Sequence, residues 1–237
     1  MHEPTTEPRP GTAAWWLARE NEPERPRRRR SLTLEGILDA SLALLDERGA
    51  AALTMRNVAE ELDCTQASLY RHVRNREELV TLLVDRAISV ASAAPPEDAD
   101  WAGKAAWSAR RFREHLRRHP GVASLLRGTE RLGPNSLAGM NYALGLFIGA
   151  GLSPRVAAAA ASSLATFVIG SVNFNLGVDT RDPEESRHRR QLFRSRDASV
   201  VPLLVEHADT LADLGDDEFE VGLTALLTGF RALIEND

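Results

Sequence analysis

The sequence predicts an all-α protein. Apolar residues recur three and four positions apart along most of the 237-residue chain, which is the spacing of one face of a helix. These apolar stripes begin after Ser, Thr, Asp or Asn, the residues that favour helix N-caps, and they end near proline or glycine. We therefore expect a small N-terminal helical domain followed by a larger C-terminal one.

The N-terminal domain is predicted from the stretch at 53–80, LTMRNVAEELDCTQASLYRHVRNREELV. Thr54 caps a first helix, and Thr65 caps a second helix after a turn at Asp63 and Cys64. A turn of this length permits only a sharp corner between the two helices. The pattern is typical of a helix-turn-helix.

A third helix follows this corner at once. Asn75 caps it, and Glu78 at the third helical position completes a capping box. The second helix is therefore held on both sides.

The second helix of the corner has one apolar face and one polar, cationic face. At 100° per residue, Leu69 and Val73 point inward. No acidic residue occurs at 64–76, so the outward face suits the major groove of DNA, where base edges need donors and phosphates need positive charge. The outward residues are Ala67, Ser68, Arg71 and His72.

The whole of this stretch resembles the signature of the tetracycline-repressor (TetR) family of bacterial transcriptional regulators. The resemblance implies an all-helical homodimer with an N-terminal three-helix helix-turn-helix DNA-binding domain. It also implies a C-terminal helical domain for ligand binding and dimerisation. By position, the resemblance assigns contacts with double-stranded operator DNA to Arg56, Gln66, Ala67, Ser68, Tyr70 and His72, and a phosphate contact to Arg76.

Two positions depart from the family pattern. Asp63 stands where the family usually has Gly, although Asp tolerates a left-handed turn. Ala67 lacks the ring or branch often found at its position. The resemblance therefore predicts insertion into the groove but no base preference.

Residues 1–31 are rich in Pro, Glu and Arg and have no long helical stripe, so we expect a mobile N-terminal arm. Trp15 and Trp16 are unusual in such an arm, and they would dock on the body of the protein at a place that the sequence does not indicate. The net charge of the chain is −5, so any DNA contact must come from local basic patches. One such patch is Arg27, Arg28, Arg29 and Arg30. It would contact phosphates or the minor groove, or else it is a solvated run of charge.

The DNA-binding domain is predicted at 32–94. Thr33 caps its first helix, and the helix after Asn75 runs to about Ala94, where two prolines stop it. This last helix begins next to the second helix of the corner, which is the recognition helix, and it ends at the next domain. We therefore expect it to transmit movements between the two.

The second domain, at 95–237, is expected to bind a ligand and to dimerise. A long helix from Ser153 to about Leu176 is nearly uncharged and is expected to be buried on most sides, and the last helix after Asp216 carries excess apolar surface. The resemblance implies that helices at these places form a four-helix dimer interface. Between them, 178–198 is predicted to be an exposed excursion.

An unidentified small-molecule inducer is the expected ligand. Aromatic and polar side chains in the second domain could line its pocket, although each residue is equally compatible with a place in the core. The candidates are Trp107, Phe112, Tyr142, Phe147, Phe167, Asn173 and Phe174.

The sequence predicts neither an enzyme nor a cofactor. His115 and His119 have metal-ligand spacing on a helix, but no third ligand is apparent, so no metal site is predicted. Cys64 has no His placed beside it, and no catalytic signature is present. With a single Cys, no signal-peptide pattern and no evident apolar run of roughly 18 residues, we expect a cytoplasmic protein without a membrane partner.

Three functions remain open from the residues alone. The favoured one is a repressor that a small molecule releases from a palindromic operator. The second is a dimeric DNA-binding regulator without a ligand, and the third is a small-molecule-binding helical protein or an enzyme.

Overall fold

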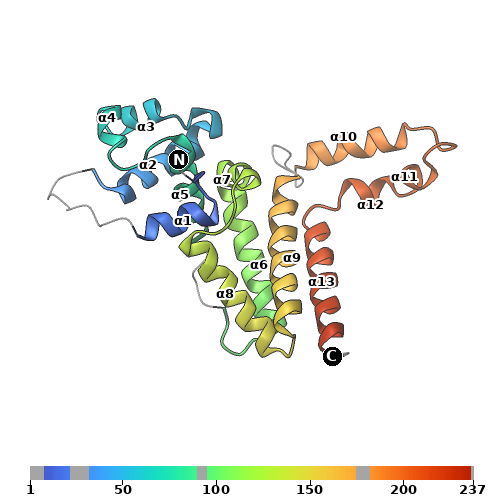
Figure 1. Ribbon diagram of the computed structural model, residues 1–237. Helices are drawn as coiled ribbons and strands as arrows, with labels where there is room; N and C mark the ends of the chain where they lie inside the picture. Colours follow the sequence, from blue (N-terminus) through green and yellow to red (C-terminus); the bar gives the residue numbers. More distant parts are fainter. Residues whose placement is uncertain (1–7, 22–31, 90–94, 175–181, 236–237) are drawn as a thin grey trace, which may run out of the picture.

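The computed structural model describes residues 8–21, 32–89, 95–174 and 182–235, and every regular element in these ranges is a helix. The all-α prediction is confirmed. Figure 1 shows the N-terminal helices gathered at one end, above a bundle whose long helices run side by side. That bundle consists of α6 (Trp101–Arg118), α8 (Pro134–Gly149), α9 (Pro154–Asn173) and α13 (Asp217–Glu235).

The N-terminal domain contains the predicted corner. Its elements are α2 (Leu34–Arg48), the 3₁₀ turn η1 (Ala50–Ala52), α3 (Met55–Glu61), α4 (Gln66–Leu69) and α5 (Arg76–Ile88). The side chains of Thr33, Thr54, Thr65 and Asn75 each accept a hydrogen bond from the backbone N–H three residues later, as expected of N-caps.

Asp63 lies in the turn between α3 and α4 with φ of 47°. This left-handed conformation is the one that glycine adopts most easily, and Asp is among the few other residues that tolerate it. The corner therefore keeps its sharp geometry despite the departure from the family pattern.

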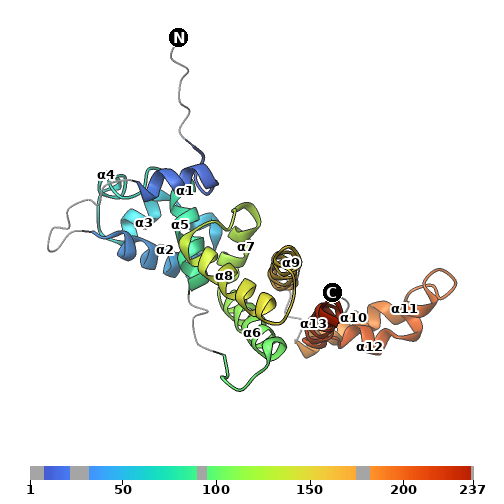
Figure 2. The ribbon, with the colours of Figure 1, turned by 60° about the horizontal axis from the view of Figure 1, so that its bottom comes forward.

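The expected mobile arm is wrong for residues 8–21. Thr12 caps α1 (Ala13–Glu20), which lies beside α5 in both views of the ribbon (Figures 1 and 2). Trp15 and Trp16 are only 4% and 9% exposed and join the core of the N-terminal domain. Two adjacent tryptophans bury enough apolar surface to hold a short helix that has little stability of its own.

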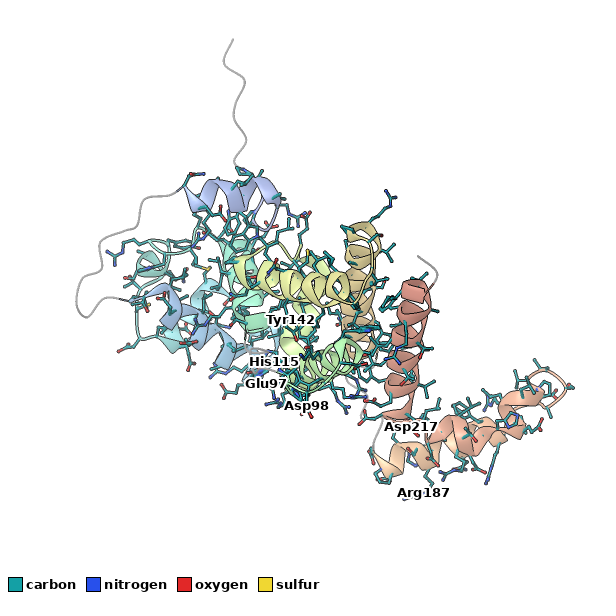
Figure 3. All side chains as sticks on the ribbon, turned by 90° about the horizontal axis from the view of Figure 1, so that it is seen from below. Glu97, Asp98, His115, Tyr142, Arg187 and Asp217 are labelled. Atoms are coloured by element: carbon teal, nitrogen blue, oxygen red, sulfur yellow. The ribbon has the colours of Figure 1, made fainter. Side chains whose placement is uncertain are left out.

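The C-terminal domain links α6 to α8 through α7 (Pro120–Leu125) and η3 (Leu126–Gly128). Beyond α9 the chain forms an extension that projects from the body of the subunit in all three views (Figures 1–3). The extension consists of α10 (Pro183–Arg194), α11 (Pro202–Glu206) and α12 (Ala208–Ala212).

Within the stretch predicted to be an exposed excursion, 178–198, residues 183–194 form the helix α10. Asp182 caps α10, and ion pairs tie α10 to α12: Arg190 lies 2.5 Å from Asp213, and Arg194 lies 2.7 Å from Asp209. Such pairs between neighbouring helices are not visible in a local sequence pattern.

α9 is less buried than the sequence predicts. Ala160, Leu164 and Val168 face the core, but the opposite side exposes a stripe of small residues. Ser153 stands at its N-cap position without a side-chain cap bond. The exposed stripe consists of Ala158, Ala159, Ser162, Ser163, Thr166 and Gly170.

α9 also corrects the expectation about apolar runs. Among the described residues it is the one helix long and apolar enough to cross a membrane, with a mean hydropathy of 1.5. Its inner face packs on α6 and α8. A core helix with Ala, Val and Ile meets the same criteria of length and composition.

The core of the N-terminal domain extends into the C-terminal domain. The apolar cluster of the N-terminal helices includes Leu116 from the end of α6, Val122 from α7 and Ile169 from α9. Gly121 permits the approach of α7 to α2, because a Cβ there would lie 2.5 Å from Cγ of Leu45. Movements of the C-terminal domain must therefore involve the N-terminal helices directly.

Candidate nucleic-acid interface and ligand domain

The recognition segment, residues 66–73, is held by its two apolar side chains. Leu69 and Val73 are fully buried. On the other side, Gln66, Ala67 and Arg71 are exposed and Ser68 and His72 are half-buried. Tyr70 also reaches the surface, with 49% of its area exposed.

Regular helical geometry ends early in this segment, because α4 stops at Leu69 and a turn carries Tyr70, Arg71 and His72. The turn is anchored by His72 and Val73, whose backbone N–H groups donate to the Leu69 carbonyl over 2.8 and 3.0 Å. The outward side chains are therefore presented on a hydrogen-bonded turn.

Ser68 organises the polar face. Its hydroxyl lies 3.0 Å from the Thr65 hydroxyl, and Nη2 of Arg71 donates to it over 3.0 Å. The cap of α4 is in this way connected to a guanidinium group on the exposed side.

Two further candidates for DNA contact have protein partners. Nε of Arg56 donates to Glu60 over 2.8 Å on the surface of α3. Nε of Arg76 donates to the Leu53 carbonyl over 2.7 Å, and its Nη2 donates to the Ala50 carbonyl over 3.2 Å. Arg76 thus braces the chain before α3, and its phosphate contact stays a prediction.

The predicted capping box is wrong in its second half. Oε2 of Glu78 accepts a hydrogen bond from the backbone N–H of Arg74 over 2.7 Å, one residue before the cap residue Asn75. Oε1 of Glu78 pairs with Arg19 of α1 over 2.6 Å. The ion pair with Arg19, which is distant in the sequence, therefore replaces the local hydrogen bond of the capping box.

Arg27, Arg28, Arg29 and Arg30 lie outside the described residues.

The structure distributes the candidate pocket residues over several environments. Phe147 is fully buried between Trp101 and Phe230, with ring centroids at 5.9 and 5.4 Å. Phe167 stacks on Phe219 of α13, whereas Phe174 is 91% exposed at the end of α9.

The other four candidates are also spread out. Trp107 on α6 lies under the guanidinium of Arg111, and Oδ1 of Asn173 accepts a hydrogen bond from Arg127 over 3.2 Å. Phe112 is half-buried and packs against both apolar cores of the molecule, and Tyr142 on α8 is 42% exposed (Figure 3). Their common role in one pocket remains a prediction.

An open groove of about 740 Å³ lies between α9 and α13. The Phe167 ring packs against Gly222 from the α13 side of the groove, and a Cβ at position 222 would lie 2.7 Å from that ring. The groove is lined by Ala159, Ser162, Ser163, Thr166, Phe167, Gly222 and Leu226.

His115 and His119 lie at the contact between the two domains. Their ring centroids are 4.6 Å apart, and Nδ1 of His119 lies 2.8 Å from Oδ2 of Asp46 on α2. Within the described part of the chain no cluster of three metal-ligating side chains occurs. Burial, together with the charge of neighbouring His119, lowers the pKa of His115.

Asp85, a buried residue of α5, connects the N-terminal domain to α8 of the C-terminal domain. Its carboxylate, in a residue only 6% exposed, accepts hydrogen bonds from the backbone N–H and side chain of both Asn135 and Ser136. The N-cap residue of α8, Gly133, offers no side-chain bond. Asp85 therefore supplies the missing cap and places negative charge at the helix N-terminus, where it is favoured.

A two-helix corner with an acid-free outward face, joined by one helix to a separate helical bundle, defines a helix-turn-helix DNA-binding regulator. The chain belongs to the tetracycline-repressor family. Residues 37–83 match the family model "Bacterial regulatory proteins, tetR family", and residues 94–234 match "Tetracyclin repressor-like, C-terminal domain".

Named relatives agree with this assignment. The class A tetracycline repressor from transposon 1721 of Escherichia coli is 30% identical over 206 residues, which cover 84% of this chain and 92% of the relative. The transcriptional repressor DrrR1 of Streptomyces coeruleorubidus is 27% identical, covering 86% of this chain and 79% of the relative.

Solved structures are also similar. The TetR family protein ActR of Streptomyces coelicolor, in complex with actinorhodin, has a TM-score of 0.76 and 32% sequence identity, covering 86% of this chain and 98% of that one. The protein is therefore a ligand-responsive, DNA-binding transcriptional regulator. As is typical of its family, it binds double-stranded operator DNA as a homodimer.

Proposed function

We propose that this regulator is a repressor that occupies a palindromic operator and leaves it when a small molecule binds. The observation that carries the proposal is the acid-free recognition segment, rigidly held at the surface and joined to the ligand domain by α5. Its activity is binding alone, without catalysis or a cofactor, in the cytoplasm.

The recognition segment enters the major groove in this proposal. The side chains that meet base edges and phosphates there are Gln66, Ala67, Ser68, Tyr70, Arg71 and His72. Arg56 and Arg76 meet phosphates beside the groove. Basic side chains next to a major-groove helix can also reach the adjacent minor groove, which is the role proposed for Arg27 to Arg30.

Replacement of Arg27, Arg28, Arg29 and Arg30 by Gln in the full-length chain tests the last assignment, because it leaves α1 in place. Both operator and random duplex should bind more weakly, and the slope of log K against log salt should become shallower, because each phosphate contact releases counterions. A slope equal to that of the wild-type protein would leave the Arg-rich segment without a DNA contact.

The ligand signal travels through α5. One end of this helix holds Glu78 beside the recognition segment, and the other holds Asp85 under α8. Two readers of one face of B-DNA must lie roughly 34–36 Å apart or at a multiple of this distance. A tilt of α5 in each subunit therefore changes the fit to the operator.

The ligand's preference for the misaligned dimer sets the size of the loss in DNA affinity. A ligand that favours the misaligned dimer by about 3 kcal/mol lowers DNA affinity by roughly two decades, and DNA must weaken ligand binding by the same factor. The complex of the related protein ActR with actinorhodin supports a small-molecule ligand for this regulator. The residues proposed to line the pocket are Trp107, Phe112, Tyr142, Phe147, Phe167, Asn173 and Phe174.

Calorimetry decides the proposal. An operator is first selected from random duplexes, and actinorhodin serves as the probe ligand because a relative binds it. We expect weaker binding of the probe to the DNA complex than to the free dimer. Equal affinity of a bound probe for the two forms would contradict ligand-controlled release, and failure to select any operator would contradict the DNA-binding role.

A further inference from the structure

The helix α1 precedes the part of the chain that matches the DNA-binding family model, which begins at residue 37. It is nevertheless built into the N-terminal domain. Trp15 and Trp16 bury their rings in its core, and Gly11, beside Thr81 of α5, has a φ of 90°, a conformation that favours glycine. The resulting position of α1 beside α5 is visible in Figure 2.

Two ion pairs connect this N-terminal segment to the start of α5, and they differ in burial. Arg9 pairs with Glu77 at the surface, where their side chains are 74% and 46% exposed. Arg19 pairs with Glu78 over 2.6 Å, and these side chains are only 23% and 3% exposed. The guanidinium of Arg19 also lies over the Trp15 ring, 5.3 Å from its centroid.

The buried carboxylate of Glu78 has two partners on opposite sides. One oxygen accepts a hydrogen bond from Arg19. The other accepts one from the backbone N–H of Arg74, which lies in the turn between the recognition segment and α5. Asn75 caps α5 from the same turn. Glu78 is therefore the link between α1 and the exit of the recognition segment.

We infer that α1 is a working part of the DNA-binding unit and that Arg19 is a positioning residue for operator recognition. Arg19 balances the buried charge of Glu78 and fixes its carboxylate in the orientation that holds the Arg74 N–H. Without Arg19, the carboxylate gains by turning toward water, because a buried charge that has lost its counter-ion is unfavourable. The turn after His72 then loses an anchor.

This inference rests on the proposed DNA-binding face, and it concerns specific binding. Reading bases requires side chains to be held within a narrow geometry, whereas attraction to phosphates depends on charge alone. A loosened turn should thus lower affinity for the operator more than affinity for random duplex.

The two ion pairs allow a matched experiment. Arg19→Met and Arg9→Met remove the same charge from the same segment, so their general electrostatic effects on DNA binding are alike. Each full-length variant is titrated with the selected operator and with a random duplex of equal length, below its melting temperature. We expect Arg19→Met to lower the ratio of the two affinities about tenfold and Arg9→Met to leave it within about twofold.

Rescue separates positioning from a loss of folding. Arg19→Lys restores a cation that can reach Glu78, so it should recover most of the ratio. If Arg19→Met does not fold, Arg19→Gln and Arg9→Gln replace the pair of variants in the same comparison. Equal ratios for the position 19 and position 9 variants would overturn the inference.

A third variant keeps this test apart from that of the DNA-binding face. Tyr70→Ala is titrated in the same assay. Normal operator binding by Tyr70→Ala would contradict the face itself. Loss of binding by Tyr70→Ala with no effect of Arg19→Met would contradict only the role of α1.

Discussion

Individual side chains in this protein serve either the DNA face or the joints that support it, and burial distinguishes the two groups. Tyr70 and Arg71 reach solvent, whereas Glu78 and Asp85 are buried and bind backbone N–H groups. Substitution of an exposed residue should change binding with little change in stability. Substitution of a buried one should change both.

Tyr70→Ala tests the exposed group. We expect a loss of roughly 1–3 kcal/mol in operator affinity, the range for a side chain that meets bases, and a change in unfolding free energy within about 0.5 kcal/mol. Tyr142→Ala is the matched control, because Tyr142 is similarly exposed but lies on α8. Fluorescence anisotropy with labelled operator gives both affinities, and equal values for the two variants would contradict the assignment.

His115 tests a buried joint through pH. Its pKa is lowered because burial and the nearby charges of His119 and Arg118 disfavour the imidazolium, while Asp46 and the Ala87 carbonyl oppose this in part. The unfolded chain, with a His pKa of about 6.5, then binds the proton more readily than the folded one. The stability from His115 is present above pH about 6.5 and is lost as the pH falls through the lower folded-state pKa.

The measurement is urea unfolding at pH 7.5 and pH 5.5. Wild-type protein should lose stability at the lower pH, and His115→Gln should lose less, since Gln does not titrate. His188→Gln, an exposed position on α10, should behave like wild type. An undiminished drop in the His115 variant would show that another group titrates in this range.

The helix α5 connects the two domains, because it makes hydrogen bonds to other segments near both of its ends. Near its N-terminus it holds the turn after the recognition segment, and near its C-terminus it caps α8. Helices joined in this way transmit tilts as rigid bodies, since packed contacts switch between arrangements more readily than they deform. This gives the proposed transmission of movement through α5 a physical basis in named hydrogen bonds.

Two glycines of α8 and its cap test this joint. A Cβ at Gly133 would lie 2.2 Å from Cγ of Asp85, whereas nothing lies within 4 Å of a Cβ at Gly139. Gly133→Ala should cost about 1–3 kcal/mol of unfolding free energy through overpacking. Gly139→Ala should add up to about 1 kcal/mol, the difference in helix propensity. Thermal unfolding of both variants checks this, and similar melting temperatures would contradict a tight α5–α8 joint.

The whole molecule presents one surface that a single subunit leaves uncovered. α9 and α13 lie side by side (Figure 1) and expose small residues along adjacent stripes, with an open groove between them. Small side chains let helices approach closely, as in the four-helix interface typical of the family. We propose this surface as the dimer interface.

Ser163→Arg tests it, because Ser163 lines the groove. A charge buried between helices is costly, so the variant should be monomeric at micromolar concentration and should lose roughly hundredfold or more in operator affinity with its second half-site contact. Ala138→Arg, at an exposed position on α8, should remain a dimer. Sedimentation gives the answer, and a dimeric Ser163 variant would place the interface elsewhere.

Local chemistry determined much of this protein in advance. The caps at Thr33, Thr54, Thr65 and Asn75 and the inward residues Leu69 and Val73 follow from short-range hydrogen bonding and helical periodicity, which a sequence displays directly. The class of protein followed from the same stretch. Departures began where partners distant in the sequence compete with local ones.

Contacts distant in the sequence settled what remained. Glu78 binds Arg74 and Arg19 instead of the N–H of its own cap residue. Part of the predicted arm forms α1, which is held by its two tryptophans. Asp85 caps α8, which is distant from it in the sequence. The aromatic residues expected in one pocket lie in the core, at the groove between α9 and α13, and in solvent, because similar side chains have similar sequence patterns in all three places. Only packing in three dimensions decides which neighbour a buried carboxylate or an aromatic ring meets.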